Sequence, residues 1–151
     1  MAAELAPPSF FESSLPVRAH VHPALNSRYS RTMPKFTHHV FICNNHRLPD
    51  DPKVSCNADG SGELQQAFKK ALAVRGLSRT IRSNKAGCLD QCEHGPTVVV
   101  YPEAVWYGNV TPADVDEIVE SHLVGGKPLE RLVIADACLN TARCEHKPRR
   151  N

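Results

Sequence analysis

Hydrophobic and polar positions along the chain fall into blocks, and each block predicts one element of secondary structure. A short apolar run at 39–43 is typical of a buried strand. Apolar residues spaced three and four apart between 64 and 72 indicate one face of a helix, which we expect to end at Gly76. Residues 80–83 form a weaker strand candidate.

Two more strands and a second helix follow. The runs at 98–101 and 105–107 are rich in β-branched and aromatic residues, and the Pro-Glu-Ala segment between them predicts a hairpin. Thr111 and Asp114 form an approximate capping box, with Pro112 at the first helical position. The buried stripe of this helix and the glycines that end it are Val115, Ile118, Val119, Leu123, Gly125 and Gly126.

The resulting order, β-α-β-β-β-α, predicts an α/β domain at residues 33–134, with a small mixed sheet and helices packed on it. Residues 1–32 contain four prolines and no apolar periodicity, so we expect a flexible N-terminal extension. Residues 135–151 are predicted to be a loose C-terminal tail. The chain shows no membrane-spanning stretch and no export signal, and we expect a cytoplasmic protein.

Charge narrows the classes of partner. Lys and Arg number 18 and Asp and Glu 16, for a net charge of +2. Residues 33–134 hold eleven of the basic and twelve of the acidic side chains, so the positive balance lies in the two ends of the chain. The middle has no basic stripe in sequence, which argues against nucleic acid as a partner; a membrane partner is also not expected.

Four of the six cysteines lie in the predicted domain, as Cys43-x12-Cys56 and Cys88-x3-Cys92. Cys43 ends the first strand, Cys56 precedes the first helix, and the second pair lies in a loop. All four can therefore converge at one end of the sheet, where sites usually assemble. A disulfide framework would expect a secreted chain, and a thioredoxin-type redox pair needs the Cys-x-x-Cys spacing that is absent here.

Metal chemistry fits the four thiols better. A zinc site accommodates the second pair, but the twelve-residue insert of the first pair makes a large, floppy chelate. His46 and His94 superficially offer the two imidazoles of a Rieske centre, yet four cysteines make them unnecessary as ligands. A four-cysteine iron–sulfur cluster carries net negative charge and needs N–H donors. Gly87 and Gly95 allow close backbone approach, and the helix start after Gly62 would direct N–H groups toward the cluster.

The residues around these cysteines resemble a known family. The matching segments are Val-Phe-Ile-Cys-Asn-Asn-His-Arg at 40–47, Ser-Cys at 55–56, Gly-Cys-Leu-Asp-Gln-Cys-Glu-His-Gly-Pro at 87–96, Val-Val-Val-Tyr-Pro-Glu at 98–103 and Val-Trp-Tyr at 105–107. Together they resemble the bacterial thioredoxin-like [2Fe–2S] ferredoxins over residues 35–134. The resemblance implies a thioredoxin-like fold, one-electron transfer rather than enzymatic catalysis, and a homodimer. It also implies a [2Fe–2S] cluster on four ligands, Cys43, Cys56, Cys88 and Cys92.

Two alternatives use the same cysteines: a four-cysteine zinc protein with a structural or regulatory role, and a thiol–disulfide oxidoreductase. In the ferredoxin interpretation, Asp90 and Glu93 beside a negative cluster favour a low potential and an unidentified redox partner that docks through a basic patch.

Outside the domain, Cys138-x5-Cys144-x-His146 offers only two thiols and one imidazole. We interpret these residues as incidental, since three ligands in a polar tail make a poor metal cage.

Overall fold

The structure is a computed structural model that describes residues 35–51, 53–141 and 144–146. The predicted extension at 1–32 and the last five residues of the predicted tail lie outside these ranges, and the domain boundaries stay predictions. The main elements are β1 (His38–Cys43), α1 (Glu63–Val74), β2 (Ile81–Ala86), β3 (Val98–Tyr101), β4 (Val105–Tyr107) and α2 (Val115–Glu117). This order confirms the predicted β-α-β-β-β-α fold class.

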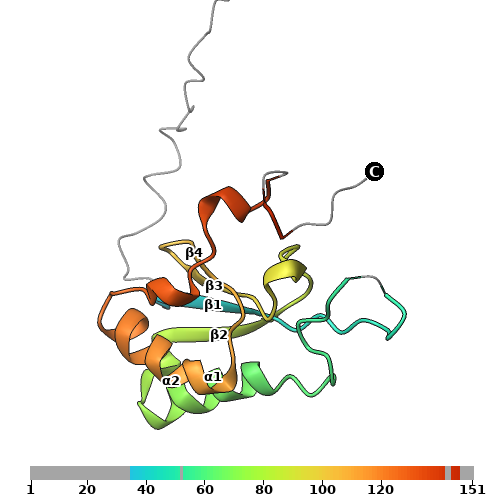
Figure 1. Cartoon of the computed structure of the whole chain (residues 1–151). Helices are drawn as coiled ribbons and strands as arrows, with labels where there is room; N and C mark the ends of the chain where they lie inside the picture. The colour runs from blue at the N-terminus through green and yellow to red at the C-terminus, as the bar shows by residue number, and fades with distance from the viewer. Residues whose placement is uncertain (1–34, 52, 142–143, 147–151) are drawn as a thin grey trace, which may run out of the picture. The chain divides into compact units, whose positions relative to one another are not determined.

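The four strands form one mixed sheet in the order β2-β1-β3-β4 (Figure 1). β1 pairs with β2 in parallel, and β3 is antiparallel to both β1 and β4. The β3–β4 pairing confirms the predicted hairpin. The helices α1 and α2 lie on the same side of the sheet and contact each other.

The hydrophobic core lies between the sheet and the two helices. Alternate residues of β1 and β3 point into it, because successive side chains of a strand face opposite sides. The fully buried members include Val40, Ile42, Phe68, Val98, Val100, Tyr107, Val115, Ile118 and Val119. Each buried large aliphatic side chain contributes about 1.5–3 kcal/mol relative to exposure. The core holds β1 rigidly, and β1 delivers Cys43 to the end of the sheet.

The third predicted element differs in length from the observed strand. The pattern indicates a strand at 80–83, whereas β2 runs from Ile81 to Ala86. All six of its residues pair with β1, from His38 opposite Ile81 to Cys43 opposite Ala86. Asn84 and Lys85 have poor strand propensity, but pairing with a buried neighbouring strand outweighs local preference.

The second helix begins as predicted and then departs from regular geometry. Thr111 and Asp114 form the capping box, with Pro112 at the start of a 3₁₀ turn. After α2 the chain continues as a π-helix over Ile118–Val124. The N–H of Gly125 donates to the carbonyl of Glu120, five residues back, at 3.0 Å. The apolar spacing does not distinguish this bonding from the usual four-residue pattern.

A buried hydrogen bond joins this π-helix to β4. The hydroxyl of Tyr107 lies 2.8 Å from Nδ1 of His122 and accepts the N–H of Leu129 at 3.2 Å. Burial lowers the pKa of His122, which favours the neutral ring. Among the residues that the structure describes, no helix is long and apolar enough to cross a membrane.

Candidate metal centre

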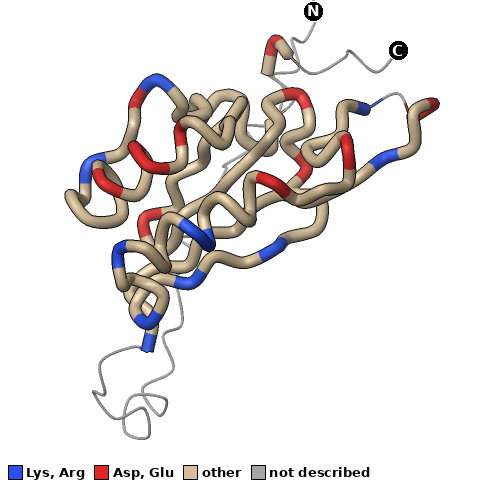
Figure 2. The backbone as a smooth tube through the Cα atoms, turned by 90° about the horizontal axis from the view of Figure 1, so that it is seen from below, with Lys and Arg blue, Asp and Glu red and all other residues tan. Residues whose placement is uncertain are grey.

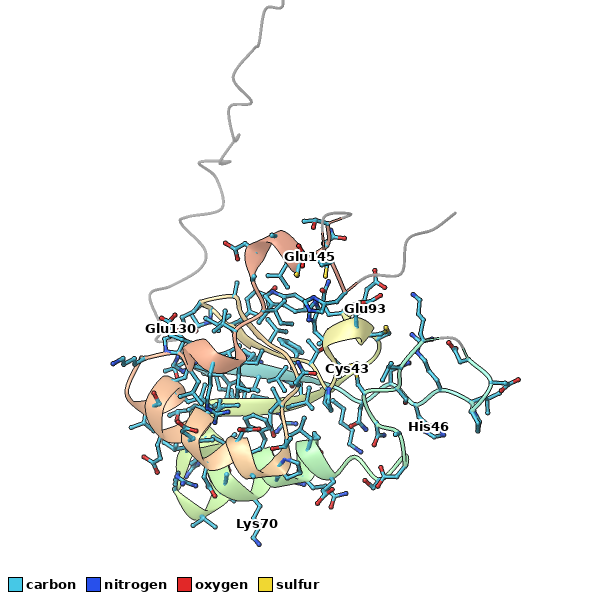
Figure 3. The ribbon with its side chains drawn as sticks, in the orientation of Figure 1. Cys43, His46, Lys70, Glu93, Glu130 and Glu145 are labelled. Atoms are coloured by element: carbon cyan, nitrogen blue, oxygen red, sulfur yellow. The ribbon has the colours of Figure 1, made fainter. Side chains whose placement is uncertain are left out.

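The four domain cysteines come from three segments that meet at one end of the sheet. Cys43 is the last residue of β1, and Cys56 lies in the loop that leads to α1. Cys88 follows β2, and Cys92 begins the 3₁₀ turn Cys92–His94. Figure 3 labels Cys43 at the end of β1 and His46 on the adjoining loop.

The sulfurs form two close pairs. Sγ of Cys88 lies 3.6 Å from Sγ of Cys92. Cys43 and Cys56 are the second pair, and each thiol shifts the pKa of the other. Two thiolates bound to one tetrahedral metal at about 2.3 Å are about 3.8 Å apart. The Cys88–Cys92 spacing therefore suits two ligands on the same metal ion.

Gly95 brings the two pairs together. A Cβ atom at this position would lie 2.7 Å from Sγ of Cys56 and 3.3 Å from the carbonyl oxygen of Cys92. Only glycine leaves room for this approach, as the sequence analysis expects for a close backbone contact. At Gly87, which flanks the pair on the other side, an added Cβ would meet nothing within 4 Å.

The four thiols differ in exposure. Cys43 is 2% exposed and Cys92 is 5% exposed, whereas Cys56 is half-buried and Cys88 is exposed. A group held by all four sulfurs is thus buried on the Cys43 side and closest to solvent at Cys88.

Local electrostatics favour a negative charge at Cys43. The hydrogen bond with Cys56 lowers the pKa of Cys43 to about 6, against the opposing effect of burial. Backbone N–H groups of Asn45 and Leu89 act in the same direction. The partner thiol shows the reverse: the bond to Cys43 and burial both raise the pKa of Cys56. Burial also raises the pKa of Cys92. The site therefore favours one thiolate by itself. A bound metal would supply the positive charge that stabilises the other three thiolates.

Backbone donors reach the sulfurs from the loops rather than from the helix start. The N–H of Asp90 donates to Sγ of Cys88 at 3.4 Å. The backbone of Thr97 favours the thiolate of Cys56 by lowering its pKa, although other groups raise it more. The sequence analysis places the start of α1 in this role. In the structure, the N–H of Gly62 donates to Oδ1 of Asn57 at 2.9 Å and that of Glu63 to Oγ of Ser61 at 3.2 Å. Polar side chains of the preceding loop satisfy these groups.

Arg47 is a site residue that the sequence reasoning missed. Its guanidinium lies 3.4 Å from Sγ of Cys88 and 3.5 Å from Sγ of Cys92. Asp51 holds the same group through an ion pair of 3.0 Å. These contacts raise the pKa of Arg47, so its charge is permanent. The sequence shows that a basic residue lies four positions after Cys43. It does not show that this residue contacts the loop that carries Cys88 and Cys92.

The two histidines considered as ligands bond elsewhere. Nδ1 of His46 lies 2.9 Å from the carbonyl oxygen of Asn57. Nε2 of His94 lies 3.2 Å from Sγ of Cys144, outside the four-cysteine site. Four sulfur donors with N–H groups and one guanidinium around them fit a negatively charged metal–sulfur group. The donor set alone also accommodates a single zinc ion.

Comparison with known proteins separates these options. No family model matches the chain. Over 98 residues it is 51% identical to a protein named 2Fe-2S ferredoxin from Aquifex aeolicus, covering 64% of this chain and 88% of the relative. A 2Fe-2S ferredoxin from Clostridium pasteurianum is 46% identical over 97 residues, covering 64% of this chain and 95% of the relative.

Solved structures give the same result. The crystal structure of the thioredoxin-like [2Fe-2S] ferredoxin from Aquifex aeolicus has a TM-score of 0.63 and 50% sequence identity to this chain. The match covers 68% of this chain and 99% of the solved one. Both the fold and the sequence therefore support the [2Fe–2S] ferredoxin interpretation over the zinc and oxidoreductase alternatives.

Proposed function

The chain belongs to the thioredoxin-like [2Fe–2S] ferredoxin family, and we propose on this basis that it is a one-electron carrier with a [2Fe–2S] cluster on Cys43, Cys56, Cys88 and Cys92. When bound, the cluster supplies a reversible one-electron couple. The chain's own residues hold it as thiolates, surround it with N–H donors and leave its Cys88 side near solvent. In this proposal the protein carries electrons and catalyses no reaction itself.

The observation that carries the ligand assignment is the pairing of the sulfurs around Gly95. The sulfurs of Cys88 and Cys92 lie 3.6 Å apart, Cys43 and Cys56 shift each other's pKa, and Cys56 approaches Cys92 where Gly95 has no side chain. Two pairs of thiolates are what two bridged iron ions require.

The test is anaerobic purification of the full chain, followed by its visible spectrum and its iron, sulfide and zinc content. We expect about two irons and two sulfides per chain and a red-brown colour that bleaches on one-electron reduction. A colourless protein with zinc in the four-cysteine site would support the zinc alternative. Disulfide reduction by a metal-free chain would support the oxidoreductase.

Single substitutions test the ligand set. We expect Cys56→Ser to change the spectrum and the electron paramagnetic resonance signal of the reduced protein, because an oxygen ligand replaces sulfur on one iron. Cys138→Ser is the matched control and leaves both signals unchanged. An unaltered cluster in Cys56→Ser would contradict the assignment at that position.

We further propose that the redox partner docks over Cys88 through a basic patch. The loops at 44–56 and 87–95 carry four acidic and two basic side chains, apart from the charge of the cluster. Lys53 already faces Asp90 at 3.7 Å, which joins the two loops into one surface. Leu48 and Val54, 72% and 64% exposed, add apolar contacts on the same loop. A basic patch with an apolar centre complements this surface.

We also propose that the chain forms a homodimer through the face of the sheet opposite the helices. An aromatic row crosses this face: Phe41 lies 6.1 Å from Tyr101 and 6.0 Å from His39, ring centre to ring centre. Tyr101 is 43% exposed. A second copy would remove this row from water. Sedimentation tests it: the wild type should have the mass of a dimer, and Tyr101→Lys that of a monomer.

The cytoplasm is the proposed location. Cys43, Cys56, Cys88 and Cys92 are all free thiols in the structure. Reduced thiols and a thiolate-bound cluster suit a reducing compartment.

A further inference from the structure

Four metal-binding side chains meet outside the four-cysteine site. Their ligand atoms all lie within 4.8 Å of one another. We name this group the tail cluster; it consists of His94, Cys138, Cys144 and His146. His94 ends the 3₁₀ turn that begins with Cys92, and the other three come from the segment at 138–146. In Figure 3, Glu93 and Glu145, which adjoin members of the cluster in sequence, are labelled near each other.

Three of the spacings between these ligand atoms are close to those of a tetrahedral site. Nε2 of His94 lies 3.2 Å from Sγ of Cys144, which in turn lies 3.7 Å from Nδ1 of His146. Sγ of Cys138 lies 4.0 Å from the same nitrogen. For zinc with sulfur at about 2.3 Å and nitrogen at about 2.0 Å, tetrahedral geometry places neighbouring S and N ligands about 3.5 Å apart.

Two members of the tail cluster, one from each side of the contact, are buried. Cys144 is 4% exposed and His94 is 8% exposed. Among the described residues of 135–146, only Cys144 is buried, while most of the others are exposed. A polar segment with so little apolar surface gains little from hydrophobic burial, so another interaction must hold Cys144 against His94.

We propose that the tail cluster binds one zinc ion as a closed Cys2His2 site. Two thiolates neutralise the charge of a divalent zinc ion, and two imidazoles complete its four ligands without an open position. A site with no open position is structural. It fastens the segment at 138–146 to the turn that also carries Cys92. The sequence of the tail offers only three of these ligands; the fourth, His94, lies 44 residues before Cys138.

The experiment measures zinc and iron together in the full-length holoprotein, purified without chelators and then supplied with zinc chloride and desalted. We expect about one zinc per chain in addition to the iron. Zinc K-edge absorption should show two sulfurs at about 2.3 Å and two nitrogens at about 2.0 Å. A shell of four sulfurs would place the zinc on the other cysteines and overturn the proposal.

Variants locate the metal. Cys138→Ser and His146→Gln each alter a residue at or near the surface, so neither should prevent folding. Both should lower bound zinc at least tenfold and leave the iron content and visible spectrum unchanged. His39→Gln, on the sheet face, is the matched control and keeps its zinc. Full zinc in both tail variants would overturn the proposal, as would a Cys138–Cys144 disulfide in the purified wild type. Because iron and zinc are counted separately, failure here is distinct from failure of the ferredoxin function.

Discussion

Arg47 places a positive charge directly beside the sulfurs of the four-cysteine site. It is the cation in contact with the sulfurs of Cys88 and Cys92, and Asp51 fixes its position. A positive charge at this distance stabilises the reduced, more negative form of the site more than the oxidised form.

Replacing this charge should lower the reduction potential. We expect Arg47→Gln to shift the midpoint downward by about 59 mV if the lost interaction is about 1.4 kcal/mol, measured by protein-film voltammetry. Lys53→Gln removes a charge that faces Asp90 instead of the sulfurs, and its shift should be smaller. Equal midpoints in wild type and Arg47→Gln would refute this role.

Gly95 tests how tightly the loops close around the sulfurs. We expect Gly95→Ala to lose iron at least tenfold faster under anaerobic chelation, since the added methyl group lies 2.7 Å from Sγ of Cys56. Gly87→Ala is a matched control, because its methyl group meets nothing within 4 Å. The idea fails if the two variants release iron at the same rate, monitored by the loss of visible absorbance.

At the level of elements, the contact between β4 and the π-helix links stability to pH. His122 is buried and lies 2.8 Å from the Tyr107 hydroxyl, and burial holds its pKa below the usual histidine value of about 6.5. The unfolded chain therefore binds a proton at this position at higher pH than the folded chain does. This contribution to stability is complete above pH 6.5 and is lost as the pH falls toward the folded-state pKa.

We expect the urea midpoint of the wild type to fall more steeply than that of His122→Gln between about pH 7.5 and about pH 5.5. This range extends about one pH unit on either side of the ordinary histidine pKa of about 6.5. Acid effects on the metal centre act on both proteins, so the difference between the two slopes isolates His122. Parallel slopes would show that its titration does not contribute.

The elements were largely predictable, and the reasons are local. β1, the hairpin and the capping box at Thr111 each depend on short patterns that the chain satisfies by itself. The end of β2 was not predictable, because Asn84 and Lys85 become strand through pairing with β1. The four cysteines could be placed at one end of the sheet from the predicted elements. The contacts of Arg47, and the approach of His94 to Cys144, join segments whose proximity only the tertiary fold determines.

For the domain as a whole, charge is distributed unevenly. The sequence shows no basic stripe, yet Lys69, Lys70, Arg82 and Lys85 surround one pocket between α1 and β2. Two of these residues come from α1 and two from β2, so the fold groups them although they form no continuous basic run in the sequence. Figure 2 shows basic positions along these two elements, where Glu63 in the first turn of α1 is the acidic exception. Such a separation orients the molecule in the field of a charged partner.

Electron transfer to a basic partner should therefore weaken with salt. With a basic c-type cytochrome as acceptor in stopped flow, we expect the second-order rate to fall about tenfold from low to high ionic strength. Asp90→Asn with Glu93→Gln should flatten this dependence; asparagine tolerates the left-handed backbone of Asp90, at φ 53°. Glu130→Gln is the control. A rate independent of salt in the wild type would count against the docking surface.

The exposure of Cys88 also determines how the protein responds to oxidation when it holds no cluster. Before a cluster is loaded, or after one is lost, this exposed thiol is the first of the four that peroxide can reach. Oxidation to a sulfenic acid would place the reactive sulfur next to the Cys92 thiol, 3.6 Å away in the structure. The two can condense with loss of water into a disulfide, which a cellular reductant can reopen. Cys92, which is a ligand beside Cys88 in the loaded protein, thus also keeps the oxidation of Cys88 reversible in the protein without its cluster.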